Sequence, residues 1–370
     1  MLIWIIQYKL LEMIHRIVKR IRKKLFVRKK KLEITKKFKL LKEHRKLSKE
    51  QKREIQNFYM DVIGEKIPLY MHEYFYSRNG IFSKNYIPST LYLADLLPKA
   101  NNYSLFSAYN DKNICNFLFP GENIVHSILK NINGYYYYED EPVSEDDAII
   151  RCKNLKEVII KPSRVSKGRG VQLISIKDGV TDIDNKTISQ LFKEYKKDFM
   201  IQDRVCQHKD MAALNPSSLN TLRILTYRSG MEILLIYSVI RIGRLNQVVD
   251  NQSAGGLCTT ISPEGKLGRY SFGKVGCDNI EKTDSGILLE GYQIPSYDKA
   301  IDFVKRLHYR LPFFDIVGWD VAIEENGEPI LVEFNLGPGL SQSAFGSGMG
   351  ENTERIIREL WPRQNTRFPE

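Results

Sequence analysis

The chain has 370 residues, of which 42% are hydrophobic and 27% charged, and its formal net charge is +12. This length allows two or three compact units with a sizeable core. The charge is local, because residues 1–50 hold 18 lysines and arginines against four glutamates, which leaves 38 basic and 40 acidic side chains elsewhere. The nearly neutral body argues against a broad nucleic-acid-binding face, and we expect no specific nucleic-acid partner, although the basic arm alone could still touch nucleic acid.

The first thirty residues predict a basic amphipathic helix. Apolar residues recur at spacings of three and four from Ile3 to Leu25, with lysines and arginines between them. Lys9 and Glu12 interrupt the apolar run too early for a transmembrane span. Such a helix suits an anionic membrane surface, where each basic residue adds about 1 kcal/mol of attraction. Packing on the protein's own body or on a partner is an equally good interpretation.

The order of helical and strand-like segments along the whole chain predicts an α+β fold. Residues 1–56 form the basic helix and a charged, helical linker, and 57–110 form a mostly helical packing region. From residue 111 strand-like runs alternate with turns, and a helical stretch surrounds residues 191–195. The strand-like runs are 158–162, 171–176, 199–206, 222–227 and 233–242.

The cysteines and histidines indicate neither a disulfide framework nor a zinc site. The five cysteines are widely spaced and form no C-x-x-C pair, and the six histidines show no metal-binding spacing. With no secretory signal, we expect a reduced, cytoplasmic protein.

A hairpin near the carboxyl end carries the strongest signal. Asn326-Gly327 between two apolar runs favours a two-residue turn with positive φ at both positions. Pairing about that turn sets Asp320 opposite Glu333, with Asn335 on the same face. That face is also predicted to hold Leu331 and Gly318, and the other face Trp319, Val321, Ile323, Ile330, Val332 and Phe334.

Two carboxylates directly opposite each other repel, so a positive partner is expected between Asp320 and Glu333. Together with the amide of Asn335 they make an all-oxygen site that suits Mg²⁺ or Mn²⁺. The alternative is a salt bridge to a lysine or arginine from elsewhere in the chain.

Two glycine-containing loops lie before and after this hairpin in the sequence. Residues 163–170 (SRVSKGRG) join two strands, follow Lys161, and carry three cations beside glycines that let backbone N–H groups approach a polyphosphate. The spacing is not that of a Walker A motif, and an exposed basic loop would look similar. After the hairpin, Gly337 to Ser343 predict a helix opening at Ser341 that could hold a substrate carboxylate, or simply a turn away from the sheet.

The order of these parts resembles the ATP-grasp superfamily. The segments SLNTLRI, RIGR…DNQSAGG and GWDVAIEENGEPILVEFNLGPG look most like the sugar-transfer associated ATP-grasp family, over residues 111–350. The resemblance implies an ATP-grasp fold in which two α+β lobes, 111–205 and 206–350, enclose ATP. Ahead of them would stand the helical region and the amphipathic helix, and behind them a C-terminal helix and tail at 351–370.

The resemblance also implies roles for individual residues. Arg223 and Arg241 would serve the γ-phosphate or an acyl-phosphate intermediate, and Asp320, Glu333 and Asn335 would hold two Mg²⁺ ions, with Mn²⁺ also suitable. Many relatives carry a carboxylate where this chain has Gln202, at the position that reads the adenine edge. The implied ATP-binding residues are Lys112, Lys161, Ser163, Lys167, Gly168, Gly170, Gln202 and Asp203.

The implied activity is an ATP- and Mg²⁺-dependent carboxylate–amine ligase that acts through an acyl phosphate. Its partners would be a small or sugar-linked carboxylate and an amine, in the modification of a surface polysaccharide or glycoconjugate, and its place the cytoplasm or the inner face of the cell membrane. Two alternatives are a sugar kinase on the same fold and a membrane-tethered nucleotide-binding scaffold without turnover.

Overall fold

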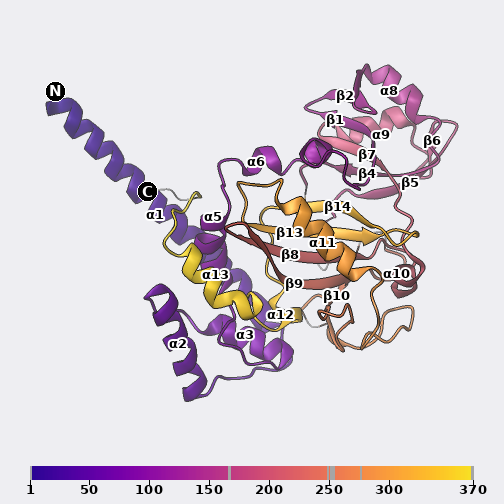
Figure 1. Cartoon of the computed structure of the whole chain (residues 1–370). Helices are drawn as coiled ribbons and strands as arrows, with labels where there is room; N and C mark the ends of the chain where they lie inside the picture. The colour runs from indigo at the N-terminus through magenta and orange to yellow at the C-terminus, as the bar shows by residue number, and fades with distance from the viewer. Residues whose placement is uncertain (1, 166–167, 248–249, 251–254, 276, 368–370) are drawn as a thin grey trace.

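The computed structural model describes residues 2–165, 168–247, 250, 255–275 and 277–367. Two antiparallel sheets and a helical region make up the body, and one long helix projects from it (Figure 1). The predicted α+β class is therefore confirmed. The exact limits of the two lobes stay a prediction.

The first sheet has seven strands in the order β3-β2-β1-β7-β4-β5-β6. Two helices, α8 (Glu145–Cys152) and α9 (Ile188–Tyr195), share one apolar core with it. Helix α9 begins with a capping box, in which Thr187 and Gln190 satisfy each other's backbone N–H groups. The strands are β1 (Ser127–Ile132), β2 (Tyr135–Tyr138), β3 (Glu141–Val143), β4 (Glu157–Pro162), β5 (Gln172–Lys177), β6 (Val180–Thr181) and β7 (Phe199–Asp203).

The second sheet has five strands in the order β10-β9-β8-β13-β14. Helix α11 (Tyr297–His308) packs on the face that carries Trp319, and the helical region covers the opposite face. The strands are β8 (Thr221–Ser229), β9 (Glu232–Ile242), β10 (Leu257–Thr260), β13 (Ile316–Ile323) and β14 (Pro329–Asn335). The helices on the opposite face are α2 (Lys49–Ile63), η1 (Tyr92–Leu96), α5 (Leu97–Ala100) and α13 (Thr353–Leu360).

Short elements connect these layers. They are α3 (Tyr70–Asn79), α4 (Ser89–Leu91), α6 (Phe106–Tyr109), η2 (Lys112–Ile114), α7 (Cys115–Leu118), α10 (Lys209–Leu214), α12 (Gln342–Phe345), η4 (Gly350–Asn352), and the small pair β11 (Ser271–Phe272) and β12 (Asp278–Ile280). The helix predicted to open at Ser341 is thus the single turn α12.

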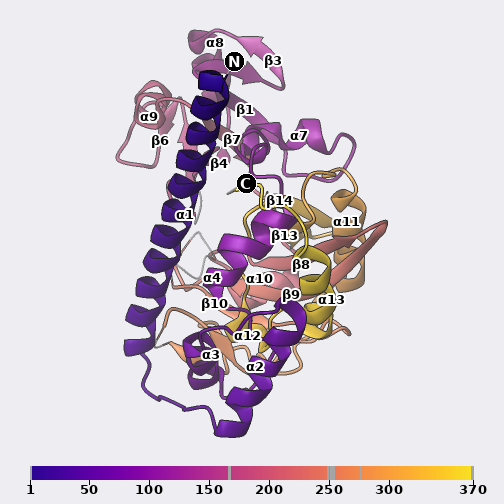
Figure 2. The ribbon, with the colours of Figure 1, turned by 90° about the vertical axis from the view of Figure 1, so that its left-hand side faces the viewer.

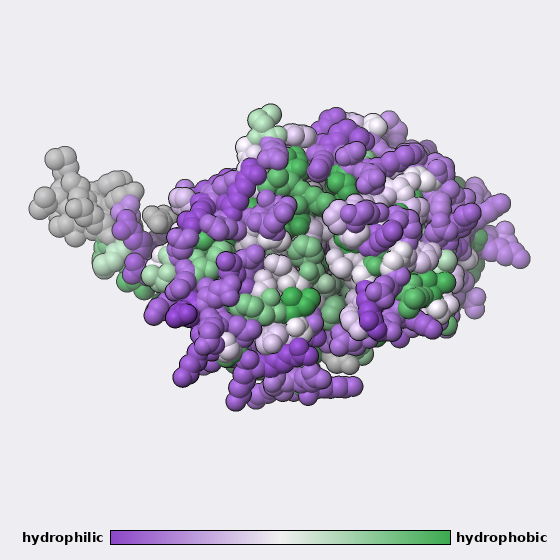
Figure 3. All heavy atoms as spheres, turned by 60° about the horizontal axis from the view of Figure 1, so that its bottom comes forward, coloured by the Kyte–Doolittle hydropathy of each residue, from purple (hydrophilic) through white to green (hydrophobic). Residues whose placement is uncertain are grey.

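The projecting helix is α1 (Leu2–Lys39), seen along its whole length in Figure 2. Its C-terminal half is anchored, because Lys23 pairs with Asp95, and Ile34 and Phe38 pack against the core of α3. From Leu10 to Leu25 the helix leaves apolar residues exposed, and Figure 3 shows green and purple spheres side by side next to its grey tip. Among the helices that the structure describes, none is long and apolar enough to cross a membrane.

The hairpin of β13 and β14 pairs Asp320 with Glu333 as predicted, but its turn differs. Gly327 alone has positive φ, and Glu324 pairs with Glu328, so the loop has three residues rather than two. A β-bulge at Val332 takes up the one-residue shift and restores the predicted register at Glu333.

Between the bulge and the turn, each side chain of β14 lies on the opposite face of the sheet from the one predicted. Leu331 packs in the core with Trp319 and Val321, whereas Ile330 and Val332 lie on the opposite face. Sequence alternation alone gave the reverse for these three residues, because the period of two holds only while no extra residue enters the strand. The outer half, from Glu333 to Asn335, follows the prediction.

One buried asparagine ties the helical region to this hairpin. Asn101 donates from Nδ2 to the carbonyls of Ile316 at 2.7 Å and Leu336 at 2.6 Å, and its Oδ1 accepts from the Ile316 N–H at 2.9 Å. It is 1% exposed, so water cannot replace these bonds.

We therefore expect Asn101→Ala to lower the free energy of unfolding by about 3–5 kcal/mol, since it strands three buried backbone groups. Urea denaturation followed by circular dichroism measures this loss. Asn102→Ala is the matched control and should cost less than about 1 kcal/mol, because the Asn102 side chain bonds only within its own exposed turn. Equal costs for the two variants would contradict the assigned role of Asn101.

Candidate functional site

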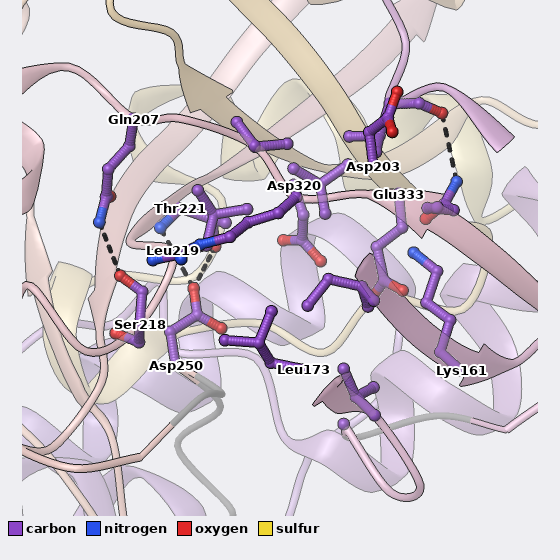
Figure 4. A pocket seen from close by; sticks show the side chains of 18 of the residues that line it. Lys161, Leu173, Asp203, Gln207, Ser218, Leu219, Thr221, Asp250, Asp320 and Glu333 are labelled. Carbon is purple, nitrogen blue, oxygen red and sulfur yellow. Dashed lines mark hydrogen bonds between the residues drawn. The ribbon is translucent and has the colours of Figure 1, made fainter. Parts of the chain in front are cut away.

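A cavity of about 440 Å³ lies between the two sheets, with walls from β4, β5 and β7 on one side and β8, β9, β13 and β14 on the other. Its walls bring apolar side chains together with charged ones. Figure 4 shows Lys161 and Glu333 with their charged ends close together and Asp320 turned into the same space. The apolar lining is Val125, Ile159, Val171, Leu173, Val205, Leu219 and Val332.

Asp320 is held by two arginines from neighbouring strands. Arg223 stands opposite it in the β8–β13 register and donates from Nη2 to Oδ2 at 2.8 Å. The Arg223 Nε lies 2.7 Å from Oδ1, although its N–H is not directed at that oxygen. Arg241 Nη1 reaches the same carboxylate at 3.2 Å. In this structure Asp320 is thus paired with arginines, which is the salt-bridge alternative that the sequence left open.

Glycine allows this arrangement next to Asp320. A Cβ on Gly318 would lie 2.6 Å from Arg223 Nη1 and 2.9 Å from the Cβ of Pro338. A side chain at Gly318 would therefore displace the guanidinium or the loop that follows the hairpin.

Two lysines face the second carboxylate. Lys112 Nζ lies 3.6 Å from Glu333 Oε2. Burial disfavours the ionised Glu333, but Lys112 and Lys161 outweigh it and hold the pKa of Glu333 at about 2. Burial lowers the pKa of Lys161 to about 8, even though Glu333 favours its charged form. Lys161 is therefore largely charged at neutral pH, and it can lose its proton at a pH just above neutral.

The loop predicted to bind phosphate is fastened at its base. Asp111 pairs with Arg164 at 2.8 Å, and the backbone N–H of Lys112 donates to Ser163 O at 3.1 Å. Lys112 Nζ also donates to Val165 O at 2.9 Å. Lys112 thus links the loop to Glu333.

Not all of the loop residues named from the sequence line the cavity. Gly168 lines the cavity with φ 67°, whereas Gly170 packs against Pro162 with φ 74°. Ser163 is fully buried beneath the loop and does not line the cavity, and its hydroxyl has no partner among the described residues. Lys167 lies outside the described residues.

Gln202 and Asp203 end β7 at the mouth of the cavity. Gln202 Nε2 donates to Val125 O at 3.2 Å and to Ser127 Oγ at 2.9 Å, so the amide is fixed by the adjoining strand. The Asp203 carboxylate lies 2.9 Å from His126 Nδ1.

Thr221 and Asp250 also line the cavity, although neither was named as a site residue from the sequence. Asp250 Oδ2 accepts from the Thr221 N–H at 3.1 Å and from its hydroxyl. Burial raises the pKa of Asp250 to about 6, against the influence of Arg241. The two residues stand 29 positions apart, so no short motif could have linked them.

The oxygen ligands around Asp320 fit a hard divalent cation. Asn335 Nδ2 lies 3.3 Å from Asp320 Oδ2, so its amide group adjoins the carboxylate pair of Asp320 and Glu333. Two carboxylates and an amide oxygen match the ligands of Mg²⁺ or Mn²⁺. Over the described ranges no cluster of three or more histidine, cysteine, aspartate or glutamate side chains could hold a metal.

Several solved structures resemble this chain at low identity. The ligase PsnB with its minimal precursor aligns at 11% identity and TM-score 0.40, over 70% of this chain and 62% of its own. The D-alanine–D-alanine ligase of Coxiella burnetii aligns at 10% and 0.41, over 68% and 56%. The VanG D-Ala:D-Ser ligase of Enterococcus faecalis aligns at 14% and 0.42, over 70% and 63%. The chain thus spans less than two thirds of each of these proteins.

A comparison with curated proteins found no match. The family model described as sugar-transfer associated ATP-grasp matches residues 92–357, which is well over half of the chain. That range includes the whole cavity between the two sheets, from Lys112 to Glu333. This chain therefore belongs to the sugar-transfer associated ATP-grasp family.

Proposed function

We propose that this protein is an ATP- and Mg²⁺-dependent ligase that joins a carboxylate to an amine. The observation that carries the proposal is the convergence of Lys112 and Lys161 on Glu333, beside Asp320, in a cavity between two sheets. A cavity that combines apolar side chains with such a charged cluster matches the base and the phosphates of a nucleoside triphosphate.

The nucleotide is assigned to the cavity by chemistry. The adenine would lie between Leu173 of the first sheet and Leu219 ahead of the second, with the backbone near Gln202 and Asp203 at its polar edge. The phosphates would meet Lys161, Lys112 and the glycine loop at Gly168, where cations and backbone N–H groups offset their charge. Ser163 would support the loop from beneath.

Asp320, Glu333 and Asn335 would hold one or two divalent cations. Bound Mg²⁺ would neutralise charge on the β- and γ-phosphates. Arg223 and Arg241, which pair with Asp320 here, would share or exchange that contact with the cation and turn toward the transferred phosphoryl group.

The reaction proposed has two steps that balance. A carboxylate oxygen of the first substrate attacks the γ-phosphorus, the bond to the bridging oxygen breaks, and ADP leaves with the electron pair. The amine then attacks the carbonyl of the acyl phosphate, the C–O bond breaks, phosphate leaves and the amine proton passes to solvent. The chain's own residues orient the reactants and neutralise charge, and the loop at 163–170 excludes water.

We further propose that the substrates belong to a surface polysaccharide or glycoconjugate, and that the protein works in the cytoplasm at the inner face of the membrane. The family description supports the link to sugar transfer. The exposed stripe of α1, made of Leu10, Ile14, Ile17, Ile21 and Leu25, supports the membrane surface, since each of these residues is 47–59% exposed.

Glu333→Gln should lower acceptor-dependent release of phosphate from MgATP by at least about 100-fold, because it removes the charge that faces both lysines and the cation. Phosphate release is measured with mixed pools of sugar acids and amines. Glu328→Gln is the matched control on the same hairpin, where Glu328 is exposed and pairs with Lys299 at 2.6 Å. Release that needs a sugar but no amine would favour the kinase instead, and unchanged release in Glu333→Gln would refute the site.

The affinity for ATP should fall as pH rises from about 7.5 to 9.5, because Lys161, with its pKa near 8, loses its charge over this range. The protonated form, present below that pKa, is the one that attracts phosphate. Titration calorimetry at fixed ionic strength measures the affinity. Lys161→Met should bind weakly and show no such fall, and a fall of equal size in that variant would assign the titration to another group.

Sedimentation with vesicles tests the membrane surface. The full chain should bind vesicles that contain phosphatidylglycerol, with binding that weakens at high salt, because basic residues flank the exposed stripe. Replacing Ile17 and Ile21 together by serine should reduce binding at least about tenfold through lost apolar burial. Ile150→Ser, on the exposed face of α8, is the control. Undiminished binding by the double variant would show that the stripe serves another contact.

A further inference from the structure

One buried carboxylate of the cavity has no part in the assignments made so far. Asp250 lines the cavity and is 9% exposed. Its Oδ2 accepts hydrogen bonds from the N–H and the hydroxyl of Thr221. Figure 4 shows these two bonds, with the other oxygen of the carboxylate directed away from Thr221. Within the described part of the chain that second oxygen, Oδ1, takes part in no hydrogen bond, so one half of the carboxylate is held and the other can meet a ligand.

The strand register places Asp250 beside the residues assigned to phosphoryl transfer. Thr221, to which Asp250 is bonded, stands opposite Arg241 in the pairing of β8 with β9. Arg241 Nη1 in turn lies 3.2 Å from Asp320. Thr221 and Arg223 are two positions apart on β8, so their side chains share one face of the sheet. Asp250 is therefore a neighbour of the arginines that would meet the transferred phosphoryl group.

Asp250 has no cation of its own among the described residues. No lysine or arginine of the described ranges forms an ion pair with it, and the nearby Arg241 is paired with Asp320. Burial raises the pKa of Asp250 and outweighs Arg241, and the charges of Asp320 and Glu333 act in the same direction as burial. A buried carboxylate without a paired cation is costly, so a positively charged ligand would be favoured there.

The reactants of the proposed ligase differ in the sign of their charge. ATP, the first substrate's carboxylate and the acyl phosphate are anions, which the charge on Asp250 would repel. A metal ion is not indicated at Asp250, because over the described ranges it does not join Asp320 and Glu333 in a cluster that could hold one. The amine is the one reactant that arrives positively charged, since an aliphatic amine is an ammonium ion at neutral pH.

We propose that Asp250 binds the amine substrate as its ammonium ion and takes the proton that must leave before the nitrogen can attack. This inference rests on the proposed function and assigns the residue that receives the second substrate. An ammonium nitrogen has no free electron pair, so the attack on the acyl phosphate needs a base. Asp250 is ionised at neutral pH, yet its raised pKa of about 6 makes it a stronger base than an exposed aspartate.

The protons balance in this step. The ammonium nitrogen loses two protons on its way to an amide. The first passes to Asp250 and from there to solvent, and it is the proton released in the reaction above. The freed electron pair forms the C–N bond, and the C–O bond to phosphate breaks. The second proton leaves on the departing phosphate, which takes the electron pair of the broken bond.

Hydroxylamine tests this role, because it is largely uncharged at neutral pH and attacks an acyl phosphate without a base. Asp250→Asn should lower amine-dependent phosphate release at least about 100-fold in the pools of sugar acids and amines. With hydroxylamine in place of the amines, the same variant should form hydroxamate within about threefold of the unaltered chain. Its affinity for MgATP, measured by titration calorimetry, should not fall.

Asp284→Asn is the matched control. Asp284 lies outside the cavity lining and pairs with Arg244 at 2.8 Å and with the Leu245 N–H at 2.9 Å, so it anchors the segment ahead of Asp250. It should leave both reactions within about threefold. If Asp250 merely shaped this segment, the two variants would behave alike, and the proposal would be wrong.

The other outcomes separate this inference from the ligase itself. Equal losses with amines and with hydroxylamine in Asp250→Asn would place Asp250 in the first step or in folding, and a lower affinity for MgATP would assign it to the nucleotide's ribose. Either result would overturn the amine site and leave the ligase standing. The absence of hydroxamate with the unaltered chain in every pool would refute the ligase, and the amine site with it.

Thr221 gives a second test if Asp250→Asn does not fold, which circular dichroism would show. Thr221 is a positioning residue, because its hydroxyl holds Asp250 Oδ2. Thr221→Val should lower amine-dependent release about tenfold and spare the hydroxylamine reaction, since one hydrogen bond to a charged group is lost. Thr221→Ser keeps the hydroxyl and should restore the rate. Equal rates for the valine and serine variants, or equal loss with hydroxylamine, would contradict the proposal.

Discussion

The structure depends on keeping two carboxylates side by side, that of Asp320 buried and that of Glu333 partly buried. Asp320 and Glu333 face each other across a hairpin, and such a pair is stable only with positive charge around it. The fold supplies that charge from two directions, with arginines of the second sheet on Asp320 and lysines of the first lobe near Glu333. The two lobes are therefore joined at the point where the chemistry is proposed to occur.

The same arrangement allows the charged side chains of the site to exchange their partners. The ion pair of Lys112 with Glu333 is long, at 3.6 Å between Nζ and Oε2, and burial makes Lys161 easier to neutralise. A polyphosphate with its cation brings both signs of charge at once. It can therefore replace the internal pairs without leaving any buried charge alone.

The helical region ahead of the sheets contributes more than packing. Asn101 closes the end of the hairpin, and the loop after the hairpin is held by the hydroxyls of Tyr92 and Tyr237. Pro338 of that loop and Arg223 both crowd the Cα of Gly318, so the helical region helps to set the geometry around Asp320.

The sequence by itself determined the α+β class, the basic amphipathic helix, the pairing of Asp320 with Glu333 and the family resemblance, because these rest on local period, turn residues and motif order. Tertiary structure decided the rest. The bulge at Val332 turned Leu331 into the core, since an extra residue in a strand is set by packing on both faces. The partners of Asp320 and the contact of Thr221 with Asp250 join segments far apart in the chain, and no pattern within one segment records which distant side chain will meet it.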